Sequence, residues 1–332
     1  MSSSIARRKF IATLGGAVAC WPCAVWAQQQ ALPVVGFVSG RSADSSTQYL
    51  AAFRQGLKEA GYVEGQNVTV EYHWLEGQYG RLRDLMADLV RRQVAVIATP
   101  GSHPAALAAK AATGTIPIVF GVGEDPVRLG LVASLARPGG NATGVNFFGQ
   151  EVVVKGLRLL HDLVPKAVRI AVLANPANSS VSEATIRKLQ EAAPTIGLTI
   201  EILNATTIGE IDAAFATFSS ARPDALFVVP DGFFSSRCGQ FATLAARDRI
   251  PATYWNRDFV AAGGLMSYGT DLADTYRQVG VYTGRILKGA KPADLAVVQS
   301  AKFVFAINHQ TARALGLEVS PDMLSIADEV IE

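Results

Sequence analysis

The chain has 332 residues, of which 49% are hydrophobic, and this length fits two lobes of ordinary domain size better than one. Residues 1–27 hold three of the 30 basic residues and no acidic residue, so the remainder carries 27 bases against 28 acids. This near-neutral balance leaves no strongly basic surface that would attract nucleic acids or anionic membranes. We therefore predict no nucleic-acid partner.

The N-terminal segment has the features of an export signal. Arg7 and Arg8 precede a short apolar run, and residues 24–27 end it in a pattern that suits a cleavage site. The paired arginines predict a twin-arginine signal peptide over residues 1–27 and a periplasmic mature protein. Two alternatives are a membrane anchor, for which the run is at the short limit, and a lipoprotein attached through Cys20.

Cysteines and histidines give no sign of a metal site. Cleavage after residue 27 would leave only Cys238 of the three cysteines, so no internal disulfide can form. The histidines are scattered, and no Cys/His cluster has metal-ligand spacing. We therefore predict neither a metal nor a cofactor.

Strands and helices alternate through the first half of the chain. Short apolar runs that end in turn residues predict buried strands, and apolar residues at helical spacing predict helices between them. The expected strands are 33–38, 67–74, 94–98 and 116–120, and the expected helices are 44–60, 79–92 and one that begins at 103. This alternation predicts a parallel sheet with helices on both faces, which binds ligands beyond the carboxyl ends of its strands.

A turn cluster at residues 137–141 marks a boundary, after which the pattern repeats. We expect residues 143–148 to be the first crossing between two lobes. The further elements are strands at 168–174, 198–203, 225–229 and 250–254, and helices at 150–163, 182–193, 208–220 and up to 247. Val34 and Ile116 are 82 positions apart, and so are Val168 and Ile250, which supports two similar lobes, although any doubly wound protein has a similar rhythm.

The stretch from Ser267 to Asp271 ends the repeat, and we expect the helix after it to return to the first lobe. The predicted fold is α/β, with two similar doubly wound parallel-sheet lobes and a multi-pass hinge. The expected lobes are residues 32–143 with 270–298, and residues 146–267 with 300–332. Such an arrangement is typical of proteins that close on a small molecule.

Polar residues at strand ends of the first half are candidate ligand contacts. Ser39 and Arg41 follow the first strand, and Arg41 could clamp a carboxylate or be a solvated loop residue. Ser102 could cap a helix or offer its hydroxyl to a ligand, with Thr99 and Gly101 beside it.

Two acidic residues end the fourth strand. Glu124 or Asp125 could bind an ammonium group, although Asp125 could instead cap a helix that begins at Pro126.

The second half offers corresponding candidates. Asn175, Asn178 and Ser179 could reach the ligand, although Ser179 could instead cap a helix. Asp231 is the preferred ammonium partner, with a turn role as the alternative. Three aromatic residues could stack on a flat ligand or serve only in packing, and these are Tyr254, Trp255 and Tyr268.

Five stretches carry a resemblance to a known family. They are AFRQGLKEAGYVEGQN (52–67), DPVRLGLV (125–132), RPGGN (137–141), SYGT (267–270) and RILKGAKP (285–292). Through them the chain resembles periplasmic substrate-binding proteins of ABC importers with the type I binding-protein fold. More narrowly, it is similar to the ABC substrate-binding family that includes aromatic-amino-acid binders.

The resemblance implies a monomeric receptor that traps a small solute by lobe closure. It also implies ABC permease and ATPase partners in the inner membrane, and a ligand such as an aromatic or branched amino acid. No nucleophile elbow, phosphate loop or dinucleotide motif is present, so we expect no catalytic residues and no enzyme. The alternatives are a periplasmic sensor without transport and an α/β enzyme of unknown chemistry. The export signal and the missing helix-turn-helix argue against a gene regulator.

Overall fold

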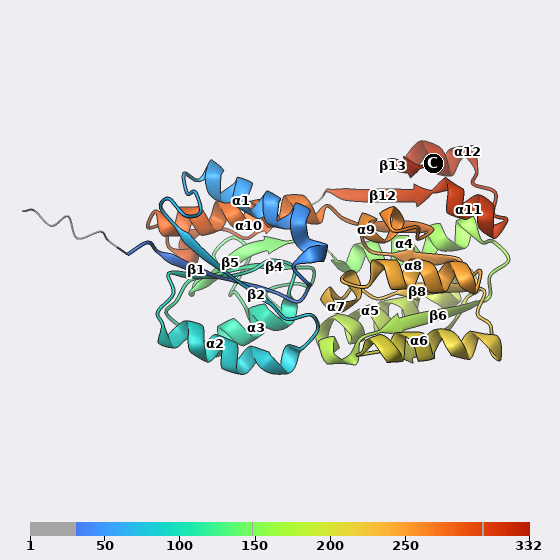
Figure 1. Ribbon diagram of the computed structural model, residues 1–332, viewed down its shortest axis with the longest axis horizontal. Helices are drawn as coiled ribbons and strands as arrows, with labels where there is room; N and C mark the ends of the chain where they lie inside the picture. Colours follow the sequence, from blue (N-terminus) through green and yellow to red (C-terminus); the bar gives the residue numbers. More distant parts are fainter. Residues whose placement is uncertain (1–30, 148, 301) are drawn as a thin grey trace, which may run out of the picture. The chain divides into compact units, whose positions relative to one another are not determined.

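The computed structural model describes residues 31–147, 149–300 and 302–332, and the predicted signal segment 1–27, with Cys20, lies outside them. The described chain forms two lobes, each built on one sheet with helices on both faces (Figure 1). No helix within these three ranges is long and apolar enough to cross a membrane.

The first lobe contains a six-stranded sheet in which every pair of neighbours runs parallel, in the order β11-β5-β4-β3-β1-β2. Its strands are β1 (Val34–Ser39), β2 (Thr69–Trp74), β3 (Val96–Thr99), β4 (Ile118–Val122), β5 (Ala142–Asn146) and β11 (Val298–Gln299). Its helices are α1 (Thr47–Glu59), α2 (Leu82–Arg91), α3 (His103–Ala112) and α10 (Leu272–Leu287). Short 3-10 turns are η1 (Asp44–Ser46), η2 (Tyr79–Arg81) and η6 (Pro292–Asp294).

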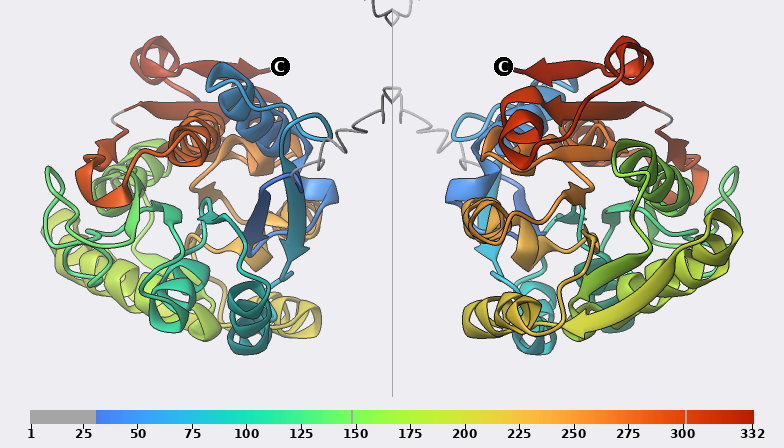
Figure 2. Two further views of the ribbon diagram at one scale, coloured as in Figure 1. Left: turned by 90° about the vertical axis from the view of Figure 1, so that its left-hand side faces the viewer. Right: turned by 90° about the vertical axis from the view of Figure 1, so that its right-hand side faces the viewer.

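Successive residues of β1 pack alternately into two hydrophobic cores, one on each face of the sheet. Phe37 packs in the core that includes α1 and α10, and Val38 packs in the core that includes α2 and α3. The end-on views in Figure 2 show the strands between layers of helices. Each fully buried side chain of this size contributes about 1.5–3 kcal/mol to stability.

Helix α10 is held to the first lobe by close packing on α1. A Cβ atom on Gly56 would lie 1.9 Å from the carbonyl oxygen of Arg277, and one on Gly280 would lie 2.2 Å from that of Phe53. Only glycine therefore allows the two helix backbones to approach this closely, and alanine at either position would separate them.

The second lobe contains a seven-stranded sheet in the order β13-β12-β10-β9-β8-β6-β7. Its strands are β6 (Arg169–Ala174), β7 (Thr199–Asn204), β8 (Ala225–Val228), β9 (Ala252–Tyr254), β10 (Met266–Thr270), β12 (Phe303–Asn308) and β13 (Glu329–Ile331). Its helices are α4 (Gly149–Leu163), α5 (Ser179–Ala192), α6 (Ile208–Ala216), α7 (Gly232–Ser235), α8 (Cys238–Arg247), α9 (Arg257–Ala261), α11 (His309–Leu315) and α12 (Pro321–Ile326). Its 3-10 turns are η3 (Pro176–Asn178), η4 (Ala193–Ile196) and η5 (Thr217–Ser219).

Two features of this lobe differ from the sequence prediction. Strand β12 runs antiparallel to β10, because the chain enters it on returning from the first lobe. The single helix expected to end at Arg247 is two helices, α7 and α8, and the first of them begins at its own capping residue, Asp231.

Within the described ranges, the chain passes from one lobe to the other at three places, and described residues at these places bond to one another. Thr270 Oγ1 donates to the carbonyl oxygen of Phe147 at 2.6 Å, and the Asp271 backbone N–H donates to that of Lys302 at 2.9 Å. The first crossing follows β5, which is a strand of the first sheet. The prediction that residues 143–148 form this crossing is therefore wrong by a few residues, because residues 142–146 pair with β4 and extend the first lobe beyond residue 143.

Candidate functional site

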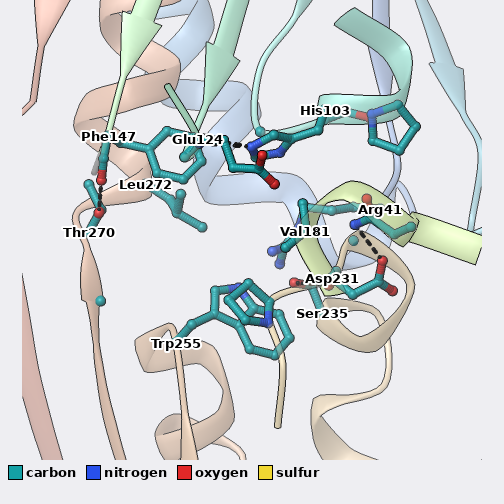
Figure 3. Close-up of a pocket in the computed structure, with 18 of the residues that line it drawn as sticks. Arg41, His103, Glu124, Phe147, Val181, Asp231, Ser235, Trp255, Thr270 and Leu272 are labelled. Carbon is teal, nitrogen blue, oxygen red and sulfur yellow. Dashed lines mark hydrogen bonds between the residues drawn. The ribbon is translucent and has the colours of Figure 1, made fainter. Parts of the chain in front are cut away.

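A cavity of about 820 Å³, a volume that includes its opening to solvent, lies between the carboxyl ends of strands from both lobes (Figure 3). From the first lobe, Ser102 follows β3 and Glu124 follows β4; from the second, Asp231 follows β8 and Trp255 follows β9. This edge is where parallel sheets bind ligands, as the sequence predicts.

Asp231 is the most heavily hydrogen-bonded group in the cavity wall. As the cap of α7, its Oδ1 accepts the backbone N–H groups of Phe233 and Phe234 at 2.9 and 3.1 Å. The amide groups of Asn175 and Asn178 donate to its two oxygens, each at 3.1 Å.

A fifth donor to Asp231 comes from the other lobe. The Tyr79 hydroxyl donates to Oδ2 at 3.0 Å, and burial together with the adjacent carboxylate raises the pKa of Tyr79 well above its usual value. Since a carboxylate has about four acceptor sites, Asp231 has little capacity left for a ligand. Its predicted role as the ammonium partner thus gives way to capping and bridging.

Glu124 is the carboxylate with a free acceptor. Its backbone is fixed on both sides, because its N–H donates to His103 Nε2 at 3.0 Å and its carbonyl accepts from Asn146 at 2.6 Å. Its Oε1 is buried and has no hydrogen-bond partner among the described residues. Burial raises the pKa of this carboxyl group, and the nearby Arg128 and Arg187 partly offset the rise.

The neighbouring Asp125 neither lines this cavity nor caps a helix. Its Oδ1 accepts from the Val127 backbone at 2.8 Å, which closes a local turn, and no helix begins at Pro126.

His103 is a neutral hydrogen-bonding residue in the wall. Its Nε2 accepts the backbone N–H groups of Gly123 and Glu124, each at 3.0 Å. An imidazole that accepts at Nε2 carries its proton on Nδ1. Burial lowers the pKa of His103 to about 4, so the ring stays uncharged at neutral pH.

The start of α3 supplies another part of the wall. Ser102 caps this helix by accepting from the Ala105 backbone at 3.4 Å, and it also lines the cavity. Both roles that the sequence left open for Ser102 are therefore compatible. Gly101 has a φ of +69°, a backbone conformation that favours glycine.

Arg41 connects the lobes instead of standing free as a carboxylate clamp. Its Nη2 donates to Asp258 Oδ2 at 2.8 Å and to the Ser45 carbonyl at 2.7 Å. The guanidinium also lies 4.6 Å from the centre of the Tyr49 ring. These contacts occupy one arm of the guanidinium fork, and the structure gives Arg41 a bridging role.

The remaining wall is largely apolar and aromatic. Trp255 packs edge-on against Phe259 with ring centres 4.7 Å apart, and it lines the cavity as one of its two predicted roles requires. The other apolar lining residues are Pro104, Phe147, Val152, Val181, Pro230, Leu272 and Tyr276. A flat apolar group would fit against such walls.

Seven predicted contacts do not line the cavity. Asp125 is one, and Ser179, which is exposed at the first position of α5 and does not cap it, is another. Tyr254 is buried and stacks on Phe259 at 4.4 Å, while Tyr268 packs on Phe303 and Phe305 of β12. Both aromatic predictions are wrong in this respect, because the rings face hydrophobic cores. The other three are buried behind the wall, and these are Ser39, Thr99 and Asn175.

Several residues line the cavity that were not predicted from the sequence, among them Tyr79, His103, Phe147, Thr270 and Leu272. Phe147 and Thr270 lie in the crossings, and their place there was the one available signal. No three His, Cys, Asp or Glu side chains of the described chain come together as a metal site.

Comparisons with known proteins agree with this architecture. A sequence model of the family described as ABC transporter substrate binding protein matches residues 32–331. A tyrosine-binding protein of Clostridioides difficile (strain R20291) is 26% identical over 266 residues, which is 80% of this chain and 76% of that protein.

Solved structures give the same result. A domain from Streptococcus pneumonia in complex with L-Trp is 26% identical and has a TM-score of 0.80, over 90% of this chain and all of that one. A ligand-free, open substrate binding protein from Clostridium difficile is 24% identical and has a TM-score of 0.61, over 90% and 99% of the two chains. The predicted type I periplasmic binding protein fold is confirmed by such likenesses.

Proposed function

Because the chain belongs to the ABC transporter substrate binding protein family, we propose that it is the solute receptor of an importer and captures an aromatic amino acid between its two lobes. Membership of this family implies that the protein binds a small molecule and acts together with transporter components. The ligand class and the closing motion are the parts that need argument from the site.

One observation carries the ligand class. The cavity combines aromatic and aliphatic walls with a single buried carboxylate oxygen, Glu124 Oε1, that has no partner in the described chain. An unpaired buried acceptor is costly, and an ammonium group would satisfy it. The apolar walls suit an aromatic side chain. The tyrosine- and tryptophan-binding relatives support the same class.

Capture by closure is supported by contacts that only a closed cleft allows. Three donors of the first lobe bond to Asp258 of the second, and the Ser42 backbone donates to Ser236 Oγ at 2.9 Å. The higher TM-score with the L-Trp complex than with the open structure fits a closed form. A ligand that touches both walls would favour this state over an open one.

The location and the partners follow from the same reasoning. Export by the twin-arginine-type signal would put the receptor in the periplasm, where it would deliver its ligand to an ABC permease powered by an ATPase. The receptor role needs no chemistry on the ligand, so the solute should be recovered unchanged after prolonged incubation.

A thermal-shift panel tests the proposal. Purified protein is melted with each amino acid, with nucleosides, with sugars and with small organic acids. A ligand at 100 times its Kd should add about 2.7 kcal/mol to stability. Shifts confined to aromatic amino acids support the proposal, and a shift confined to another class overturns it. Deletion of the gene should then abolish uptake of the bound solute; unaffected uptake would indicate a sensor instead.

A further inference from the structure

A second cavity adjoins the first and shares part of its wall. It encloses about 1,350 Å³, including the part open to solvent, and both cavities are lined by Gly123 and Glu124. The first lobe contributes the segment after β4, and the second contributes one face of α5. Glu124 is therefore accessible from both cavities.

The second cavity is lined by three basic and two acidic residues, and the acidic ones are Glu124 and Asp125. Its basic residues are Arg128 from the first lobe and Arg187 and Lys188 from the second. Lys188 lies 3.8 Å from Glu191, but Arg128 and Arg187 have no ion pair or side-chain hydrogen bond within the described ranges. Each lobe thus presents one unpaired guanidinium group beside Glu124.

We propose that Arg128 and Arg187 together bind the α-carboxylate of the captured amino acid, while Glu124 binds its ammonium group and the side chain enters the first cavity. The inference rests on the proposed function and adds an orientation for the ligand. In an amino acid the ammonium and carboxylate groups are attached to the same carbon. Any cation that binds the carboxylate must therefore lie close to the acid that binds the ammonium group.

Arg41 is the alternative cation. It lines the first cavity, and its buried Nε has no hydrogen-bond partner among the described residues. Its Nη2 already bonds to Asp258 and Ser45, however, so it cannot offer a free bidentate fork. Arg128 and Arg187 are near enough to lower the pKa of the Glu124 carboxyl group. A carboxylate held by one arginine from each lobe would also bridge the cleft. The bound ligand would therefore stabilise the closed state relative to the open one.

The test uses three probes that differ only in their charged groups: L-tyrosine, tyramine, which lacks the carboxylate, and 3-(4-hydroxyphenyl)propionate, which lacks the ammonium group. Binding to the purified full chain is measured by calorimetry, with competition against L-tyrosine for the poorer ligands. The variants are Arg128→Gln, Arg187→Gln, the double variant and Glu124→Gln. The controls are Arg83→Gln and Arg158→Gln, which replace exposed arginines that line neither cavity.

The double variant should bind L-tyrosine about ten-fold less tightly and leave the affinity for tyramine unchanged. Glu124→Gln should weaken L-tyrosine and tyramine but not the propionate. The loss should appear in the dissociation rate, because a ligand without net charge gains little from long-range attraction. Melting curves check that each variant is folded.

The outcomes separate the two proposals. If the wild-type protein binds aromatic amino acids and the double variant binds L-tyrosine equally well, the orientation is wrong and the proposed function stands. Equal losses of L-tyrosine and tyramine in the double variant would also overturn the orientation. If the wild-type protein binds no aromatic amino acid, both proposals fail.

Discussion

Arg41 and Asp258 form an ion pair between the two lobes, with Nη2 2.8 Å from Oδ2, although 217 positions separate them in the sequence. Tyr49 and Gln48 of the first lobe donate to the same carboxylate at 2.8 and 2.6 Å. The Asp258 side chain thus takes three donors from the opposite lobe, and opening of the cleft would separate it from all of them.

Replacement of Asp258 by asparagine should shift the protein toward an open state. The Arg41 side chain is only 5% exposed, so the loss of its charge partner leaves a buried guanidinium unpaired when the lobes are closed. We expect the closed state to lose about 2 kcal/mol and the ligand Kd to rise at least ten-fold. Calorimetry gives the Kd, and small-angle scattering gives the radius of gyration.

The matched control for this variant is Asp248→Asn. Asp248 pairs with the adjacent Arg247 at the surface of one lobe, so its change should leave both measurements as in the wild type. Equal affinities for Asp258→Asn and Asp248→Asn would show that the ion pair does not influence closure.

Gly232→Ala should obstruct closure without unfolding either lobe. A Cβ atom on Gly232 would lie 2.9 Å from the carbonyl carbon of Gly40, which belongs to the other lobe, and its φ is not positive. Overpacking of this kind costs about 1–3 kcal/mol, which should appear as weaker ligand binding at an unchanged melting temperature of the ligand-free protein. Gly239→Ala is the control, since its Cβ would meet nothing within 4 Å.

Trp255→Ala should weaken an aromatic ligand by about 2 kcal/mol, or about 30-fold in Kd. The side chain lines the cavity and is partly exposed to it, so its loss removes apolar contact with the ligand. Trp74→Ala, on the edge strand β2 and outside this cavity, should leave the Kd unaltered. A normal Kd for Trp255→Ala would place the aromatic group of the ligand elsewhere.

His103 should make stability depend on pH between about 6.5 and 4. In the unfolded chain the imidazole takes up a proton near its ordinary pKa of about 6.5, whereas in the folded protein its pKa is about 4. Stability is therefore complete above this window and falls by up to about 3 kcal/mol as the pH drops through it.

His103→Gln isolates this effect, because the glutamine oxygen can accept the same two backbone N–H groups but does not titrate. Urea midpoints at pH 7, 6, 5 and 4 should fall less for this variant than for the wild type. His309→Gln, outside the cavity, serves as the control and should follow the wild type. Parallel wild-type and His103→Gln curves would contradict the assignment.

The sequence was sufficient for the fold and for the position of part of the polar cavity wall. Parallel strands place their carboxyl ends at one edge, so the residues that follow them, such as Ser102, Glu124, Asn178 and Asp231, were correctly located on the cavity wall. The roles of these residues were harder to predict. The hydrogen-bonding capacity of the Asp231 carboxylate is filled in part by Tyr79, which is 152 positions away and in the other lobe.

The aromatic predictions failed for a different reason. Strands buried on both faces have no apolar-polar alternation. The sequence at the end of β9 therefore does not show which of the two adjacent aromatic residues packs in a core and which lines the cavity. Tyr254 enters a core while the next residue, Trp255, lines the cavity. Tyr268 is covered by the antiparallel strand β12, a pairing that the repeat of the two halves does not indicate.

Calorimetric titration of the full chain with L-tyrosine and L-tryptophan measures whether the two lobes enclose an aromatic amino acid. We expect one ligand per chain and a negative heat-capacity change, since apolar surface is buried in the cavity. No binding of either amino acid, with saturable binding of a sugar or a nucleoside by the same folded protein, would contradict this expectation.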